Sequence, residues 1–122
     1  MRKTDIDRVP APGFVFVQED VSTDSGWHHY ARHQVLYASS GMLELDAEGG
    51  RWLLPPRRMA WITADVSHRV NAHASTRLCT AYLTRELVIA PDFALRVFAA
   101  PSVAREMLLY GARWDIDRRA PA

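Results

Sequence analysis

The sequence predicts a small, mainly β domain: a β-barrel or sandwich of the jelly-roll class with one amphipathic helix at its C-terminal end. Two observations lead to this expectation. Short apolar stretches with strand-like patterns follow one another up to residue 83, and turn-forming residues separate them at regular intervals. After Pro91 the apolar spacing changes to the period of an α-helix.

The expected strands follow an N-terminal arm. Two prolines and a glycine break the charged N-terminus, so residues 1–13 form the arm and residues 14–100 the barrel. Glycine-containing turns at 39–41 and 48–50 bracket a stretch that alternates with period two, which is typical of a β-meander. The expected strands are residues 14–17, 34–38, 42–46, 51–54, 59–62, 67–71 and 76–83.

One helix is expected over residues 101–113. Val103, Met107 and Leu108 fall at helical spacing, and most of the charged residues lie off that face. This apolar stripe either packs on the barrel or forms a dimer contact. Residues 114–122 are rich in charge and contain a proline, so they are expected to be a linker towards a C-terminal module that this sequence does not contain.

Composition and charge fit one globular domain with no general attraction to nucleic acid. The chain has 122 residues, 48% of them hydrophobic, and its 15 basic and 14 acidic residues give a net charge of +1. About two thirds of the surface of such a chain is buried on folding, enough for one core. The single cysteine, Cys79, excludes an intrachain disulfide, and no apolar stretch suits a signal peptide or a membrane span. We therefore expect a cytoplasmic protein without direct contact to nucleic acid or membrane.

A histidine-rich segment, WHHYARHQVLYASSG, resembles the first motif of metal-binding members of the cupin superfamily. The motif spacing is kept at His28, Tyr30, Gln34 and Gly41, and His68 stands in the place of the second motif's histidine. The resemblance implies a cupin barrel. Metal-binding cupins have a second His and a Glu where this chain has Tyr30 and Gln34.

A longer block resembles the N-terminal, ligand-sensing domain of AraC-type transcriptional regulators. In that group a strand ending in Q-x-L-Y-A leads to G-x-W-x-x-P-P and then to W-I-P-x-x-x-x-H. The matching residues are Gln34, Leu36, Tyr37, Ala38, Trp52, Pro55, Pro56, Trp61, Ile62 and His68. The proline of the last motif is replaced by Thr63. The resemblance covers roughly residues 20 to 114 and implies an effector inside the barrel, a homodimer and a helix-turn-helix module beyond this chain.

The matched residues indicate a mixed pocket for a small molecule. In an extended chain, side chains two residues apart share one face, and donors and acceptors beside apolar walls suit a ligand. The candidate pocket residues are His28, Tyr30, Gln34, Leu36, Trp61 and His68. Val70, with Met59 or Trp61, is expected to complete the apolar lining. The alternative is that His28 and His68 only form hydrogen bonds within a polar core and bind no ligand.

The same residues form a weak metal site. A divalent metal prefers imidazole nitrogens together with an anionic carboxylate, and the only candidate set, His28, Gln34 and His68, has no carboxylate. We therefore expect no resident cofactor and no catalytic residues. The remaining histidines are expected on the solvated surface: His29, His33 and His73.

Three functions fit these observations. The favoured one is a non-enzymatic, ligand-sensing and dimerising domain, in which an effector shifts the balance between arrangements of arm, barrel and helix. The second is a small metal-dependent cupin enzyme, an oxygenase or isomerase, with His28 and His68 as ligands and Tyr30 as acid or base. The third is a free-standing cupin that binds a metabolite without chemistry.

Overall fold

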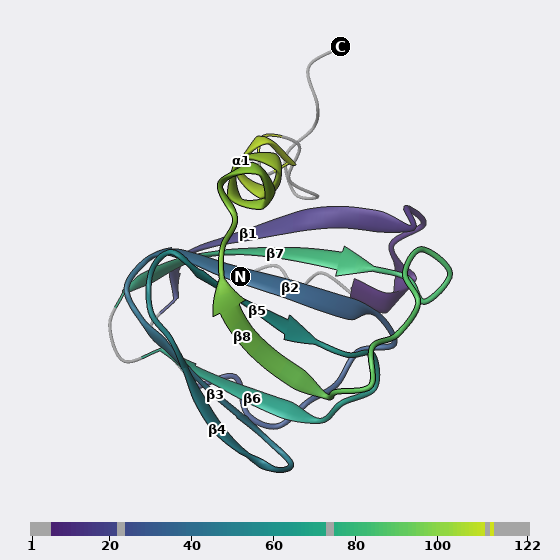
Figure 1. Ribbon diagram of the computed structural model, residues 1–122, viewed down its shortest axis with the longest axis horizontal. Coiled ribbons are helices and arrows are strands. Elements are labelled where there is room, and N and C mark those ends of the chain that lie inside the picture. The colour runs from purple at the N-terminus through teal and green to yellow at the C-terminus, as the bar shows by residue number, and fades with distance from the viewer. Residues whose placement is uncertain (1–5, 22–23, 73–74, 112, 114–122) are drawn as a thin grey trace.

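Two antiparallel β-sheets packed face to face make up the fold (Figure 1). The computed structural model describes residues 6–21, 24–72, 75–111 and 113. The five-stranded sheet has the order β1 (Gly13–Val21), β7 (Thr76–Leu83), β2 (His33–Ser40), β5 (Arg58–Ile62) and β8 (Leu95–Ala99). The three-stranded sheet has the order β4 (Gly50–Leu54), β3 (Leu43–Ala47) and β6 (His68–Ala72). The mainly β, jelly-roll fold expected from the sequence is confirmed.

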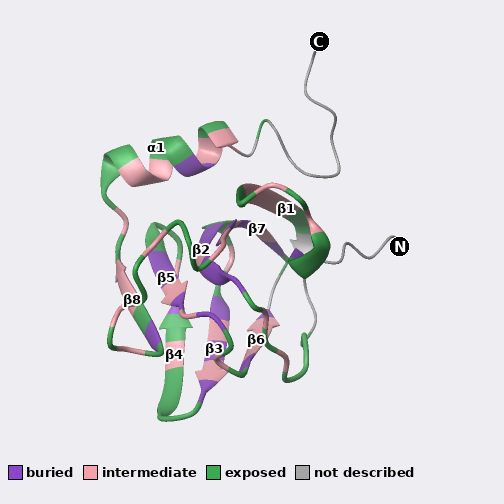
Figure 2. Ribbon diagram, turned by 90° about the vertical axis from the view of Figure 1, so that its right-hand side faces the viewer, coloured by how far each residue is buried: buried purple, intermediate pink, exposed green. Residues whose placement is uncertain are grey.

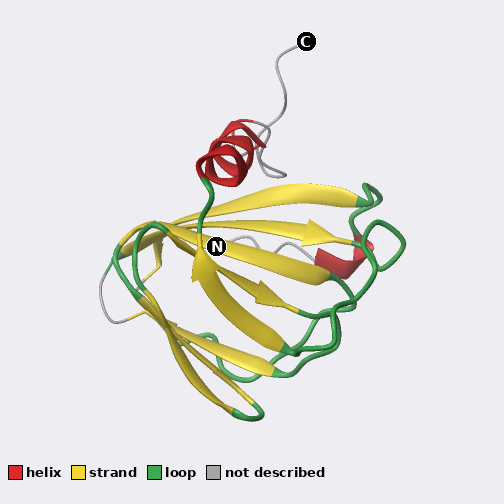
Figure 3. Cartoon of the chain, viewed as in Figure 1, coloured by secondary structure: helices red, strands yellow, loops and turns green. Residues whose placement is uncertain are grey.

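The strands form because their apolar residues alternate with polar ones. In β3, Leu43, Leu45 and Ala47 are buried, whereas the intervening Glu44 and Asp46 are only partly buried. Period-two alternation of this kind places one face of the strand against the opposite sheet and the other towards solvent. Figure 3 shows how short loops join these strands, as the turn residues in the sequence predict.

Gly41 sits at a turn that only glycine fits. Its φ of +78° lies in the left-handed region. A Cβ atom there would lie 2.2 Å from the Oγ1 atom of Thr76 and 2.9 Å from the carbonyl oxygen of Ser75. The glycine of the sequence motif is therefore explained by the turn between β2 and β3, which brings the chain against the start of β7.

The main core lies between the sheets. Both sheets contribute aliphatic side chains that are almost fully excluded from solvent. Its buried members are Leu36, Ala38, Leu43, Leu45, Ala47, Leu54, Ala60, Ile62, Ala72, Leu78 and Leu95. Burial of this apolar surface is the dominant favourable contribution to folding.

A second core lies on the outer face of the five-stranded sheet, where α1 (Ser102–Gly111) covers it (Figure 2). Leu108 is the buried contact of the helix and packs with Tyr37, Met59 and Cys79. A Cβ atom on Gly111 would lie 2.8 Å from Val15 Cγ2, so the end of the helix lies close against β1. The expected C-terminal helix is present, and its buried side packs on the barrel.

Two features of the fold differ from the sequence expectation. β8 was not expected, because its five residues, Leu95–Ala99, carry only short apolar alternation between two prolines. It pairs with β5 as an edge strand and contributes Leu95 to the main core. Within the expected arm, a short 3-10 helix at Ile6–Arg8 buries Ile6. The expected linker at 114–122 lies outside the described residues, and within the described ranges no helix has the length and hydrophobicity to cross a bilayer.

Core packing gives a first prediction, for which the chain offers a matched pair of leucines in the smaller sheet. Leu45 in β3 is 0% exposed, whereas Leu53 in the neighbouring β4 is 56% exposed. We expect Leu45→Ala to lower the free energy of unfolding by about 2–5 kcal/mol, since it leaves a cavity. Leu53→Ala should cost less than about 1 kcal/mol. Urea denaturation measures both, and equal losses would contradict this description of the core.

Candidate functional site

The segment from Asp24 to Tyr30 forms one wall of the candidate site. It joins β1 to β2 and pairs on the way with the edge of β6 that β3 leaves free. The backbone N–H of His28 donates to the carbonyl of His68 at 2.9 Å, and the N–H of His68 donates back to the carbonyl of His28 at 2.9 Å. The N–H of Ser25 donates to the carbonyl of Val70 at 2.8 Å. The segment therefore extends the three-stranded sheet and closes one side of the barrel.

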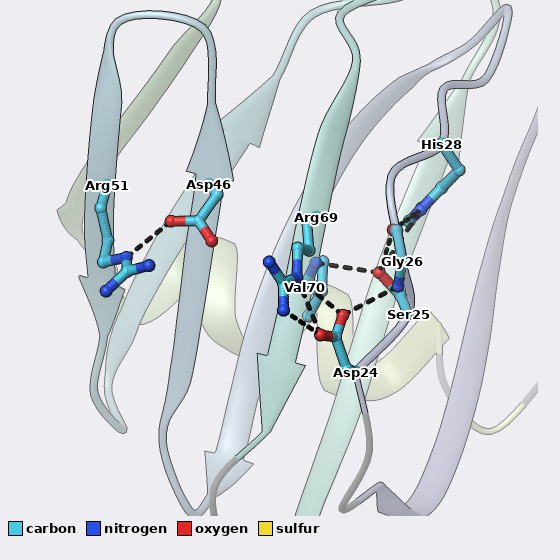
Figure 4. Close-up of polar contacts among 8 residues, drawn as sticks. All are labelled: Asp24, Ser25, Gly26, His28, Asp46, Arg51, Arg69 and Val70. Carbon is cyan, nitrogen blue, oxygen red and sulfur yellow. Dashed lines mark hydrogen bonds and ion pairs between the residues drawn. The ribbon is translucent and has the colours of Figure 1, made fainter.

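An ion pair fixes the start of this segment (Figure 4). The Arg69 Nε atom lies 2.9 and 2.8 Å from the two carboxylate oxygens of Asp24, and Nη2 also contacts the carboxylate. The backbone N–H of Gly26 donates to the same carboxylate at 2.8 Å. The Arg69 guanidinium, with the Gly26 N–H, lowers the pKa of Asp24 to about 2. Arg69 faces away from the barrel, as strand alternation with His68 predicts.

A cavity of about 320 Å³ opens between this segment and the five-stranded sheet. Such a volume lies at the lower end of the range for small-molecule sites. Its lining comes from β1, β2, β6, β7 and the 24–30 segment. The lining residues are Gln18, Val21, Ser25, His28, Tyr30, Gln34, Leu36, Val70, Leu78, Thr80 and Tyr82.

Strand register gives the cavity two chemically different ends. Gln34 lies opposite Tyr82 in the pairing of β2 with β7, and Leu36 lies opposite Thr80 one step further along. What we call the polar end consists of His28, Tyr30, Gln34 and Tyr82. What we call the apolar end consists of Val21, Leu36, Val70 and Leu78, and two polar lining residues adjoin it: Gln18, which lies opposite Leu78, and Ser25, which hydrogen-bonds to the backbone of Val70.

Hydrogen bonds orient the two imidazoles at the polar end. His68 Nδ1 lies 2.8 Å from the carbonyl oxygen of Val66, and His28 Nδ1 lies 3.0 Å from that of Gly26. Because a carbonyl only accepts, these partners place a proton on Nδ1 in both rings. The lone pair of His68 Nε2 then accepts from the side-chain amide of Gln34 at 3.3 Å. The ring centroids of the two histidines are 4.3 Å apart.

Burial keeps His68 neutral. The side chain is 1% exposed, and removal from water lowers its pKa to about 4, although the carbonyl of Val66 opposes the shift. A neutral ring at this position is what the hydrogen bond from Gln34 requires, since a protonated Nε2 could not accept. His68 therefore acts as a fixed acceptor for Gln34.

Aromatic rings complete the polar end. Tyr30 meets His28 edge-on at 5.2 Å between ring centroids, and it meets Tyr82 edge-on at 5.5 Å. The Tyr82 hydroxyl hydrogen-bonds to Tyr30 and Thr80, and burial raises its pKa. On the other side, the Tyr82 ring stacks on Phe14 of β1 at 5.3 Å. The phenol groups are thus held by packing as well as by hydrogen bonds.

The structure brings together most of the residues selected from the sequence. His28, Tyr30, Gln34 and Leu36 line the cavity, as expected from their shared face. His68 lies directly behind them, in contact with both His28 and Gln34. Val70 also lines the cavity, as expected.

Trp61 does not line the cavity. Trp61 pairs with Val35, whose side chain points to the opposite face of the sheet from Gln34 and Leu36. Its indole N–H donates to Thr63 at 2.9 Å. Met59 shares this outer face and belongs to the core beneath α1. The residues of β5 that turn inwards are Ala60 and Ile62.

The expectation of a surface position for His33 was wrong. The side chain is 1% exposed, and its ring centroid lies 5.0 Å from that of Trp61. His33 Nδ1 accepts a hydrogen bond from the backbone N–H of Ala64 at 3.0 Å, and burial lowers its pKa. Strand alternation correctly placed His33 off the cavity face, but packing near Trp61 buries that face. His29 is exposed, as expected, and His73 lies outside the described residues.

Sequence reasoning missed the part of the lining that comes from β1 and β7. Leu78, Thr80 and Tyr82 alternate along β7 and face the cavity together. Their alternation was visible in the sequence, but β7 lies between β1 and β2 only in the folded sheet. No local pattern indicates that pairing between distant segments.

The donor set fits a divalent metal poorly. The lining offers one imidazole, two amides, two phenols and two aliphatic hydroxyl groups, His68 lies directly behind it, and the lining residues that the structure describes include no carboxylate. Among the residues that the structure describes, no three His, Cys, Asp or Glu side chains are grouped closely enough to hold a metal ion. Gln34, which stands in the place of the metal-binding glutamate, donates to His68 instead.

Comparison with known proteins extends this description. No family model matches the sequence, and no curated protein matches it. Solved structures do match. Protein NMB1881 from Neisseria meningitidis is 26% identical with a TM-score of 0.55, over 60% of this chain and 75% of that one. A cupin-2 domain-containing protein from Shewanella frigidimarina is 19% identical with a TM-score of 0.54, over 66% of this chain and 82% of that one.

The third comparison is with ToxT from Vibrio cholerae, an AraC-type regulator, bound to (E)-4-(8-methylnaphthalen-1-yl)but-3-enoic acid. It is 6% identical with a TM-score of 0.61, over 88% of this chain and 51% of ToxT. At such identities the likeness establishes the fold. The chain therefore has the cupin fold. It shares this fold with a cupin-2 protein and, more particularly, with the N-terminal domain of ToxT. The chain spans about half the length of ToxT.

The pKa of His68 gives the second prediction. The unfolded chain binds a proton at His68 near pH 6.5, but the folded protein does so only near pH 4. The stability contributed by the neutral ring is therefore complete above pH 6.5 and is lost as the pH falls towards 4. We expect a loss of about 2–3 kcal/mol over this interval.

Urea denaturation at several pH values measures this loss. His68→Gln should remove most of it, whereas His29→Gln, at the exposed neighbour of His28, should retain it. An unchanged pH dependence in His68→Gln would assign the titration to another group.

Proposed function

We propose that this chain is the effector-binding domain of an AraC-type transcriptional regulator and binds a small molecule in its barrel without catalysis. The observation that carries the proposal is the 320 Å³ cavity with its polar end, inside a fold shared with the N-terminal domain of ToxT. ToxT itself is bound to a small organic acid. In a regulator of this type a separate helix-turn-helix module would bind the DNA.

The cavity favours a ligand site over a polar core. In a polar core, His28 and His68 would form hydrogen bonds only with other groups of the protein and would not line a cavity. Instead, His28 and Tyr30 are half-buried and line a cavity whose other walls are Leu36 and Val70. Donors and acceptors that converge on an apolar cavity are the usual makeup of a small-molecule site.

The N-terminal arm is attached directly beside the polar end. Both carboxylate oxygens of Asp7 accept from the backbone N–H of Ala31, at 3.0 and 3.1 Å. Arg32 donates to the carbonyl of Ala11 at 2.7 Å and also to that of Val9. A ligand that moves the neighbouring Tyr30 would disturb these contacts. Such a ligand would favour one arrangement of the arm over another by its difference in affinity for the two.

We further propose a homodimer formed through α1. Val103, Met107 and Tyr110 form an outer stripe that is 72%, 70% and 58% exposed. They follow the spacing i, i+4, i+7 of one helical face. Glu106 and Arg113 border this stripe with opposite charges, so an antiparallel second copy would place Glu106 near the partner's Arg113.

The ligand site is tested with two adjacent histidines. A thermal-shift screen of small metabolites identifies an effector, and its affinity is then measured for His28→Ala and His29→Ala. We expect His28→Ala to weaken binding about tenfold, since it removes one hydrogen bond. Gln34→Ala should weaken binding likewise, and both variants should remain folded. His29→Ala should bind normally, and equal binding by all variants would place the site elsewhere.

The dimer is tested by placing a charge in the outer stripe. We expect Met107→Glu to shift the protein to a monomer in sedimentation velocity, because a carboxylate in the apolar contact would lose its hydration. Leu53→Glu, an equivalent change at an exposed leucine of β4, serves as the control and should leave the oligomeric state unchanged. A wild-type protein that is monomeric at high concentration would contradict the proposed contact.

A further inference from the structure

We propose that the cavity selects an uncharged, amphipathic ligand whose polar head both donates and accepts hydrogen bonds, such as a primary amide or an alcohol, and that it disfavours carboxylates. This inference rests on the proposed function, since it names the class of molecule that the same site would take. It also separates this chain from ToxT, whose ligand in the structure compared above is named as an acid.

Within the ranges that the structure describes, the lining carries no formal charge from an acidic side chain, a lysine or an arginine. An ionised ligand would lose its hydration on entry without gaining a counter-charge. Transfer of an unpaired ion into such surroundings is far more costly than transfer of a neutral group that keeps its hydrogen bonds. The lining therefore favours a neutral ligand.

The strands and loops that form the cavity also carry arginines, but these do not line it and have other partners. Arg69 of β6 binds Asp24 on the outer face of the barrel. Arg77 of β7 binds Glu19, with 2.8 Å between Nε and the carboxylate. Arg32, just before β2, donates to the backbone carbonyls of the arm. To bind a carboxylate, any of these would have to give up a contact described here.

The polar end needs a ligand that donates. His28 Nδ1 donates to the carbonyl of Gly26, so in the neutral imidazole Nε2 is the acceptor. Gln34 uses one amide N–H on His68 and retains the other, together with its carbonyl oxygen. An ionised carboxylate only accepts, so it would leave the lone pair of His28 without a donor. An amide or hydroxyl head satisfies both residues.

Tyr82 also contributes no charge to this end. Burial is the main cause that raises the pKa of its hydroxyl, followed by the neighbouring Tyr30, so the group stays neutral and offers a ligand hydrogen bonds only.

The apolar end sets the shape of the rest of the ligand. Along β7, Tyr82 at the polar end and Leu78 at the apolar end are four residues apart, a distance of about 13 Å. Val21, Leu36 and Val70 line the second half of that length, together with the polar residues Gln18 and Ser25. A head group with one aromatic ring or a short alkyl tail fits this arrangement.

Matched pairs of compounds test the inference. Each pair has one carbon skeleton as a primary amide and as a carboxylate: 3-phenylpropanamide with 3-phenylpropanoate, indole-3-acetamide with indole-3-acetate, and hexanamide with hexanoate. Binding at pH 7.5 is measured by ¹H–¹⁵N NMR titration of the whole chain. We expect the amide to bind about tenfold more tightly than its acid, with shifts at residues that line the cavity.

The outcomes distinguish the inferred preference for uncharged ligands from the proposed ligand-binding function. Equal or tighter binding of the acids would overturn the inference while leaving the ligand-binding function in place. Failure of every pair to bind at millimolar concentration would contradict the ligand-binding function itself.

A charge-bearing variant gives an independent test. His28→Lys replaces the lone pair with an ammonium donor, so the preference should turn towards the acids. His29→Lys adds the same charge at an exposed neighbour outside the lining and should keep the preference for amides. An unchanged preference in a folded His28→Lys variant would show that the polar head does not contact His28.

Discussion

The pairing of the 24–30 segment with the free edge of β6 is the constraint on which the site depends. It satisfies backbone groups that would otherwise remain unpaired at a sheet edge, and the ion pair between Asp24 and Arg69 fixes its position. The same pairing carries His28 and Tyr30 to the cavity and brings His28 beside His68. The connection between β1 and β2 thus forms one wall of the cavity and also supplies two of its polar side chains.

At the polar end, each hydrogen bond determines which atom of the next residue donates and which accepts. The carbonyl of Val66 accepts from His68 Nδ1, so His68 Nε2 can accept from the side-chain amide of Gln34. Burial keeps the His68 ring neutral. In metal-binding relatives of this fold the corresponding positions hold charged or metal-binding donors, and the sequence showed that Tyr30 and Gln34 depart from them. With those departures, the described lining presents hydrogen-bonding groups and no carboxylate.

Local patterns in the sequence were sufficient to predict most of the fold and the residues of one wall of the cavity. Alternation placed His28, Tyr30, Gln34 and Leu36 on a common face, and glycine turns marked the strand ends. Trp61 was misplaced because the face of β5 that turns inwards depends on its register with β2, which no local pattern contains. β7 illustrates the same limit, since its neighbours β1 and β2 are distant in sequence. His33 was assigned to the surface because packing over the outer face of a sheet leaves no periodic signal.

The junction between β8 and α1 has a mechanical consequence. Only Ala100 and Pro101 join the edge strand to the helix, and the N–H of Ala100 donates to the carbonyl of Arg57 at 3.2 Å. Two residues span at most about 7 Å, so the junction has almost no slack to absorb movement. Any displacement of β5 and β8 must therefore move the N-terminal end of α1 as well.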